Sequence, residues 1–450
     1  MLKIMDHPSP AAEKALGRIA GRGLVYSRTE YAAVNRILED VRRRGDRALV
    51  DYTRRFDCPG FAAADLPVGK AEMAAARSAV GRDFLRALDR AARQVESFHR
   101  RQLRTGFMSL ERPGTMLGQV VRPVGQAGVY VPGGRGGRTP LVSSVLMGAI
   151  PARVAGVERV VMTTPPTAEG RVAPELLVAA QTVGVNEVYK AGSAWGIGAL
   201  AFGTATVPRA DVIVGPGNLY VALAKKIVAG TVGVDIVAGP SEVLVIADDA
   251  ATPEFVAADL LAQAEHDPTA SAVLVTPARG LAQAVRAEVE RQRRELARAE
   301  IAGASIDRFG AAFVVADLDA ALALANRLAP EHLELHVREP FALLGGVRNA
   351  GAVFVGEWTP EAIGDYVAGP NHVLPTAGTA RFASALSVDH FLKRTSVIHY
   401  SQAAFRREAR DVLSLARVEG LDAHARSVSL RLEARRKGKG VEGSRGQGVE

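Results

Sequence analysis

The chain has 450 residues, which is more than one ordinary domain and enough for two or three. Hydrophobic residues make up 48% and charged residues 23%, the balance of a globular rather than a disordered protein. The single cysteine, Cys58, excludes an intramolecular disulfide and any zinc site built from several thiolates. Because no apolar run has the length of a membrane span and the start lacks a secretory pattern, we expect a soluble, cytoplasmic protein.

The formal net charge of +8 raises the question of nucleic-acid binding. Five basic and two acidic residues lie in the C-terminal stretch 434–450, which has no core-forming apolar pattern and is predicted to be a disordered tail. Elsewhere, basic residues alternate with acidic ones, and no stripe of aromatic residues accompanies them. These features argue against nucleic-acid binding and favour solvated helix faces.

The first 105 residues form an N-terminal helical segment, because 31–56 and 70–102 carry apolar residues at helical spacing. After residue 119, short β-branched runs alternate with alanine-rich amphipathic stretches, which predicts parallel α/β sheets. The expected strands are 128–131, 159–163, 187–190, 211–214, 242–246, 272–275, 313–315 and 352–355.

The Gly239-Pro240 break divides these strands four and four. We therefore predict an α/β fold with two Rossmann-like parallel-sheet domains side by side, 106–238 and 239–380. A C-terminal helical segment, 381–433, follows them and precedes the tail.

Two glycine clusters were considered as phosphate-binding sites. The stretch Gly196-Ile-Gly198 resembles part of a dinucleotide fingerprint, but no glycine-rich turn precedes it, so these glycines are better explained as packing residues within a helix. The cluster from Pro132 to Arg138 follows a predicted strand and could cradle an anion through backbone amides. A flexible loop explains it equally well.

Polar clusters gather in the second half of the chain, where seven of the nine histidines lie at or after residue 266. Gln263 and His266 stand three apart near the end of a predicted helix and therefore share one face. Such a pair can hold a metal ion, although on an exposed helix end it is more often simply solvated.

Glu331 and His332 occupy the junction between a predicted helix and a predicted strand, where α/β proteins keep their chemistry. A carboxylate beside an imidazole offers two proton carriers with different pKa values. His336 shares the polar side of that strand, and we expect it to be a surface residue.

Two further segments combine turn-forming residues with possible ligands: one holds Asp365 and His372, and the other holds Glu419 and His424. Together with Gln263 and His266, the side chains of Asp365 and His424 would give nitrogen and oxygen donors without a thiolate. That set suits a zinc ion kept open to a substrate, although spacing alone cannot show that the four converge.

At these residues the sequence resembles the histidinol dehydrogenase family. The resemblance runs through Gly215-Pro-Gly-Asn218, Ala238-Gly-Pro-Ser241-Glu, Gln263-Ala-Glu-His266, Pro330-Glu331-His332-Leu333 and Glu419-Gly-Leu-Asp-Ala-His424. It covers nearly the whole chain from about residue 30 to residue 432.

The resemblance implies a role for each matching residue. It gives one zinc ion per subunit, bound by Gln263, His266, Asp365 and His424, and a catalytic pair, Glu331 and His332. Substrate binding is implied for the four zinc ligands and His332, and also for Ser241, His372 and Glu419. NAD contacts are implied at Tyr130 and Asn218, and at position 195, where the family usually has glutamine and this chain has Trp195.

The reaction that the resemblance implies is a double, NAD-linked oxidation of L-histidinol to L-histidine through L-histidinal, at the end of histidine biosynthesis. It also implies an intertwined homodimer, in which the C-terminal segment carries Glu419 and His424 into the partner's site.

Two departures from the family pattern leave an alternative open. These are Trp195 and a loop at 135–142 that is about three residues longer than the family pattern. The alternative is a paralogue that oxidises another small alcohol, such as a sulfonated diol, with NAD. A third class, a binding protein with a structural zinc ion, would need neither the Glu-His pair nor an NAD site.

Overall fold

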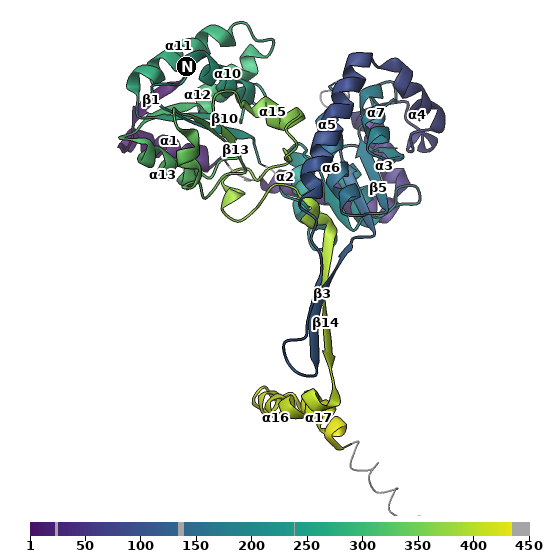
Figure 1. Ribbon diagram of the computed structural model, residues 1–450. Coiled ribbons are helices and arrows are strands. Elements are labelled where there is room, and N and C mark those ends of the chain that lie inside the picture. Colours follow the sequence, from purple (N-terminus) through teal and green to yellow (C-terminus); the bar gives the residue numbers. More distant parts are fainter. Residues whose placement is uncertain (23–25, 134–138, 238, 434–450) are drawn as a thin grey trace, which may run out of the picture. The chain divides into compact units, whose positions relative to one another are not determined.

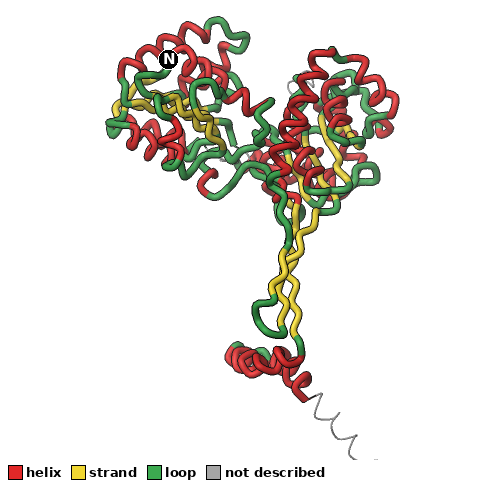
Figure 2. The backbone as a smooth tube through the Cα atoms, in the orientation of Figure 1, coloured by secondary structure: helices red, strands yellow, loops and turns green. Residues whose placement is uncertain are grey.

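The computed structural model describes residues 1–22, 26–133, 139–237 and 239–433. The predicted disordered tail and most of the Pro132–Arg138 cluster lie outside these residues. The described part contains two parallel sheets covered by helices, and a third, antiparallel sheet (Figures 1 and 2). The predicted fold class, with two Rossmann-like halves, is therefore confirmed.

The first parallel sheet has the strand order β6-β5-β4-β7-β8. Its strands are β4 (Gln126–Tyr130), β5 (Arg159–Thr164), β6 (Glu187–Lys190), β7 (Val212–Val214) and β8 (Gly233–Val234). Its helices are α2 (Arg28–Arg44), α3 (Asp46–Phe56), α4 (Lys70–Ala76), α5 (Arg82–Arg100), α6 (Val142–Val154), α7 (Pro174–Thr182), α8 (Ser193–Phe202) and α9 (Leu219–Val228).

Side chains of this sheet alternate between two apolar layers. Val129 belongs to the layer that includes residues of α5, α6 and α7, whereas its neighbour Tyr130 belongs to the layer with α2, α3, α8 and α9. Because the strands are covered on both faces, they read as nearly continuous apolar runs. Gly196 and Gly198 lie inside α8 as packing residues, with Gly198 against Leu38 and Val41, as predicted.

The second parallel sheet has the order β1-β11-β10-β9-β12-β13. Its strands are β1 (Lys3–Asp6), β9 (Glu242–Ala247), β10 (Ser271–Thr276), β11 (Ala311–Val314), β12 (His332–His336) and β13 (Ala352–Val355). Its helices are α1 (Pro10–Ala20), α10 (Pro253–Ala264), α11 (Arg279–Arg293), α12 (Ala299–Phe309), α13 (Leu318–Leu328), α14 (Pro340–Leu344) and α15 (Glu361–Tyr366).

One face of the second sheet packs in a layer with α10, α11 and α12, and the other with α1 and α13. Leu333 and Leu335 of β12 belong to the α1/α13 layer. Because side chains alternate along a strand, His332, Glu334 and His336 point to the other face, which α10 covers. The polar stripe of this strand is therefore buried beneath a helix.

The N-terminus differs from the predicted all-helical segment, because residues 3–6 form β1. This strand pairs in parallel with β11 at the edge of the second sheet, although about 300 residues separate the two in sequence. Figure 1 shows β1 and α1, in purple, beside the green elements of the second half. The strand is too short for a periodic signal.

The remaining residues, 104–122 and 393–433, form a separate compact unit. Its sheet has the order β14-β3-β2, with β2 (Phe107–Ser109), β3 (Thr115–Pro123) and β14 (Leu392–Tyr400), and two helices follow, α16 (Gln402–Val418) and α17 (Asp422–Glu433). We expected only helices in 381–433. The strand β14 was missed because most of its residues are exposed, so it has no alternating apolar pattern.

Candidate active site

The predicted catalytic pair lies at the amino edge of the second sheet. Strands β9 and β12 are adjacent and parallel, and His332 pairs with Val243. Glu331 and His332 therefore lie beside Ser241 and Glu242, where both strands begin. This differs from the usual position of α/β sites, at the carboxyl ends of the strands. The reason is local: the pair precedes its strand instead of following it.

His332 is buried, and its surroundings fix its protonation. Its Nδ1 lies 3.1 Å from the backbone carbonyl oxygen of Glu242. A carbonyl oxygen only accepts hydrogen bonds, so the tautomer with its proton on Nδ1 makes this contact a hydrogen bond and leaves the lone pair on Nε2. Burial lowers the pKa of His332 to about 4. The ring is thus a neutral imidazole with one free nitrogen.

Glu331 is buried next to it, and its side chain is held in place from β9. Its Oε2 accepts a hydrogen bond from the backbone N–H of Glu242 at 3.0 Å. Burial raises the pKa of Glu331 well above the usual value, and the neighbouring Glu242 carboxylate adds to the rise. A carboxylate with a raised pKa is a better proton acceptor than an ordinary one.

An arginine that follows the N-terminal helix α1 supports this edge. The Arg22 guanidinium pairs with the Glu242 carboxylate and also donates to the backbone oxygens of Ser241 (3.1 Å) and Thr269 (2.9 Å). Its side chain is only 2% exposed. Arg22 thereby fixes the segment that contacts both catalytic candidates.

Gln263 is completely buried at the end of α10 and faces the same group of residues. With its amide nitrogen turned toward this group, Gln263 donates to the Glu242 backbone oxygen and to Oε2 of Glu361, both at 3.2 Å, and the same nitrogen lies 3.1 Å from Nδ1 of His332. This orientation leaves the amide oxygen available to another partner, such as a metal ion. The expectation that a Gln-His pair on a helix end is simply solvated is therefore wrong for Gln263.

Asp365, His266 and His372 complete the group. Asp365 Oδ1 lies 3.6 Å from His372 Nδ1, and one oxygen of Asp365 lies within 4.8 Å of ligand atoms of His332 and Glu361. Burial tends to raise the pKa of Asp365, but its close contact with His372 and the charges of the nearby histidines outweigh burial and lower it. His266 is close enough to affect both Asp365 and His332 electrostatically.

The donor chemistry of this group fits a zinc ion. Gln263, His266 and Asp365 offer an amide oxygen, an imidazole nitrogen and a carboxylate oxygen, and the unengaged amide oxygen of Gln263 needs a partner. The fourth predicted ligand, His424, is an exposed residue of α17, in the separate unit. Glu419 is exposed at the end of α16 in that unit.

The predicted NAD residues lie in the first half. The order β6-β5-β4-β7-β8 reverses direction between β4 and β7, and such a switch point is the usual ligand crevice of an α/β sheet. Tyr130 ends β4, and its hydroxyl accepts a hydrogen bond from the Ser193 backbone N–H at 3.0 Å. Asn218 follows β7 and caps α9, accepting from the N–H groups of Tyr220 and Val221.

The loop between β7 and α9 passes unusually close to β4. Gly215 has φ +117°, and a Cβ there would lie 2.1 Å from the Tyr130 carbonyl oxygen, so only glycine fits. Its N–H donates to Asp235 Oδ2 at 2.8 Å and its carbonyl accepts from Lys225 Nζ at 2.9 Å. The side chains of Lys225 and Asp235 form a buried ion pair that holds this loop on both sides.

Trp195 lies within the apolar layer of this half and is only 4% exposed. Its ring stacks on Tyr52 and Phe56, with centroids 5.8 and 5.6 Å away. Its indole N–H donates to the Thr53 hydroxyl at 3.2 Å. The packing of this unusual residue is thus explained by α3, and its contact with NAD stays a prediction.

His336 is not the surface residue that we expected. It is 2% exposed, because α10 covers its side of β12. The sequence also gave no indication that Glu242, Glu334 and Glu361 are buried. Glu361 follows Pro360 at the start of a helix, a position where an exposed acidic residue is ordinary, so the sequence carries no signal of its burial.

Comparisons with known proteins show the family of this chain. The family model for histidinol dehydrogenase matches residues 24–432. A histidinol dehydrogenase of Desulfotalea psychrophila is 56% identical over 402 residues, covering 89% of this chain and 93% of that protein. One from a Synechococcus strain is 52% identical over 438 residues, covering 96% and 99%.

The fold also matches a solved structure. The crystal structure of histidinol dehydrogenase from Elizabethkingia anophelis superposes with a TM-score of 0.89 and 35% identity, covering 97% of this chain and 99% of that one. The chain belongs to the histidinol dehydrogenase family of oxidoreductases.

Proposed function

We propose that this enzyme oxidises L-histidinol to L-histidine through L-histidinal, using two molecules of NAD and one zinc ion at the catalytic site of each subunit. The observation that carries the proposal is the buried pair Glu331 and His332, next to three of the four predicted zinc ligands. Burial shifts the two pKa values in opposite directions, raising that of Glu331 and lowering that of His332. In the part of the chain that the structure describes, no helix has both the length and the apolar character needed to cross a membrane.

The first oxidation requires a group that accepts the alcohol proton while hydride leaves the carbon for NAD. His332 suits this role because its Nδ1 proton is directed at the Glu242 carbonyl and its Nε2 is free. After each transfer the proton must leave before the ring can act again. The low pKa of about 4 favours that release.

The second oxidation requires water to add to the aldehyde. Glu331 suits the role of water activator, because it is held beside His332 and burial raises its pKa. His332 then accepts the proton of the hydrate as a second hydride leaves. The product of these two steps is a carboxylate.

Substrate and cofactor contacts form the rest of the proposal. A zinc ion held by Gln263, His266, Asp365 and His424 would bind and orient the substrate's imidazole and amino nitrogens. Ser241, His372 and Glu419 would contact the substrate, and Tyr130, Asn218 and Trp195 would line the NAD site. We further propose a homodimer in which His424 and Glu419 serve the site of the other subunit.

Product analysis with competing substrates tests this function. Purified enzyme with NAD should convert L-histidinol into L-histidine, identified by chromatography, and kcat/KM should exceed that for a sulfonated diol by at least about 100-fold, the selectivity expected of a site that pairs with substrate polar groups. Higher kcat/KM for the diol would favour the paralogue instead. NADH formation from neither alcohol would contradict both.

A further inference from the structure

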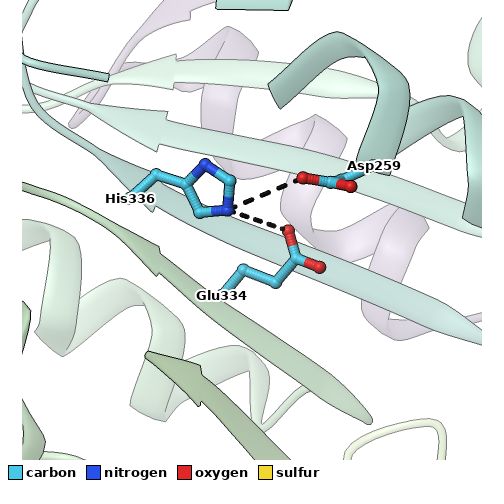
Figure 3. Close-up of side chains that lie close together, drawn as sticks. All are labelled: Asp259, Glu334 and His336. Atoms are coloured by element: carbon cyan, nitrogen blue, oxygen red, sulfur yellow. Dashed lines mark ion pairs between the residues drawn. The ribbon is translucent and has the colours of Figure 1, made fainter. Parts of the chain in front are cut away.

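A second group of possible ligands lies away from the proposed catalytic site. Asp259 of α10 and Glu334 and His336 of β12 point toward one another beneath the helix (Figure 3). His336 Nε2 lies 3.6 Å from Asp259 Oδ2 and 3.5 Å from Glu334 Oε2. The side chains of Glu334 and His336 are fully buried, and that of Asp259 is 11% exposed.

These atoms lack the partners that buried polar groups normally have. Glu334 Oε2 and both ring nitrogens of His336 are buried without a hydrogen bond. The separations of 3.5 and 3.6 Å are too long for hydrogen bonds to the ring nitrogen. Among the described residues, neither lysine nor arginine forms an ion pair with this group. A protonated His336 balances only one of the two buried carboxylates when both are ionised, so the group still carries a net negative charge, which is costly to bury.

The same separations fit ligands arranged around a metal ion. Zinc binds imidazole nitrogen and carboxylate oxygen at about 2.0–2.2 Å, so tetrahedral ligands lie about 3.3–3.6 Å from each other. The three ligand atoms of this group all lie within 4.8 Å of one another. Three protein ligands leave the fourth position of a tetrahedral site open to water.

The position in the fold is a second, independent indication. The order β1-β11-β10-β9-β12-β13 changes direction between β9 and β12. His336 ends β12 and pairs with Ala247 at the end of β9. The group therefore lies toward the carboxyl edge of the sheet at its switch point, where α/β sheets commonly bind ligands. The catalytic pair lies at the opposite end of the same strands.

We propose that Asp259, Glu334 and His336 form a second divalent-cation site, with zinc or a similar transition metal as its ion. The dication would neutralise both carboxylates and join α10 to β12. It is separate from the catalytic site, although the two are connected: Glu334 Oε1 accepts a hydrogen bond from the backbone N–H of Glu361 at 3.0 Å. The exposed edge of Asp259 gives the ion a route inward.

Metal counting tests this site. The full-length protein is stripped with a chelator, reloaded with zinc and dialysed, and zinc per chain is measured by elemental analysis. We expect two ions in the wild type, one in His266→Ala, one in His336→Gln and none in the double variant. His399→Gln, which removes an exposed histidine of β14, is the matched control and should keep two.

A second readout does not depend on the folding of the His336 variant. Zinc should still raise the melting temperature of His266→Ala, because the remaining site binds the native state only. The proposal would be overturned by one ion in the wild type and none in His266→Ala, together with no change in the melting temperature of His266→Ala when zinc is added. Asp259, Glu334 and His336 would then bind protons but no metal ion. One ion kept in His266→Ala but lost in His336→Gln would support it and contradict the catalytic ligands instead.

Discussion

At the residue scale, the two members of the catalytic pair have duties that experiments can separate. In the proposed mechanism, His332 accepts a proton in both oxidations, whereas Glu331 is required after the aldehyde forms. His332→Asn should therefore slow both histidinol and histidinal oxidation by about 10²–10⁴-fold, the usual contribution of general acid–base catalysis. Glu331→Gln should spare the first oxidation and slow the second. Single-turnover NADH formation from each substrate, with zinc content checked, measures both effects.

Two outcomes of these rate measurements would contradict the roles proposed for Glu331 and His332. Equal slowing of both substrates by Glu331→Gln would show that the carboxylate has no separate role in the water step. Near-normal rates in His332→Asn would remove His332 from the mechanism.

The low pKa of His332 also predicts how stability varies with pH. Burial lowers this pKa to about 4, whereas an unfolded histidine titrates near 6.5. Between these values the unfolded chain binds a proton that the folded chain does not, so stability falls as the pH falls from about 6.5 to 4. The full loss is about 3 kcal/mol. The free energy of unfolding should therefore fall less between pH 7 and pH 5 in His332→Asn than in the wild type.

Parallel pH profiles for the two proteins would contradict this assignment. The control is His399→Gln, because His399 is exposed and its replacement should leave the wild-type profile unchanged.

The candidate site shows how far sequence reasoning reaches at this scale. Gln263, Glu331, His332 and Asp365 could be named from their motifs, and the structure brings them together. Glu361 and Glu334 could not, because burial of a carboxylate depends on which elements cover it. His336 was assigned the wrong environment for the same reason: a polar strand face can meet either water or a helix.

At the element scale, the loop between β7 and α9 depends on the buried ion pair of Lys225 and Asp235. Lys225→Met leaves the Asp235 carboxylate buried and unpaired, which typically costs about 3–5 kcal/mol. It also removes the donor to the Gly215 carbonyl. We expect a lower melting temperature and a several-fold higher KM for NAD, with little change in KM for histidinol.

Two further variants separate folding from cofactor binding. Lys225→Met with Asp235→Leu should regain much of the stability, because no charge remains buried, yet keep the raised KM for NAD. Lys226→Met, at the exposed next position, should behave like the wild type. An unchanged KM in the double variant would show that this loop does not contribute to the NAD site.

The success of element prediction varied with burial. All eight expected strands exist, because each contributes apolar side chains to the packed layers of a sheet. Among the strands that were not predicted, β14 is largely exposed, and β1 has four residues. Its partner β11 is distant in the chain, and such long-range pairing leaves no local pattern in sequence.

At the scale of the whole molecule, the proposed homodimer makes a quantitative prediction. If each site combines Glu331 of one subunit with His424 of the other, Glu331→Gln and His424→Ala chains should complement each other. Co-expression at equal levels gives half mixed dimers, and each of these holds one intact site, so about a quarter of the wild-type activity for histidinal should return. Each variant alone should be nearly inactive toward histidinal.

Different affinity tags on the two chains allow the mixed dimer to be purified and assayed by itself. Activity no higher than that of the separate variants would show that both residues act within one chain. A monomer at assay concentrations would contradict the shared site altogether.

The most direct test of the account is the amount of NADH formed per L-histidinol consumed. One site that holds both a proton acceptor and a water activator should complete both oxidations before the product leaves. We therefore predict two NADH and one L-histidine per histidinol, without free histidinal accumulating. One NADH per histidinol, with the aldehyde as the product, would contradict the central claim.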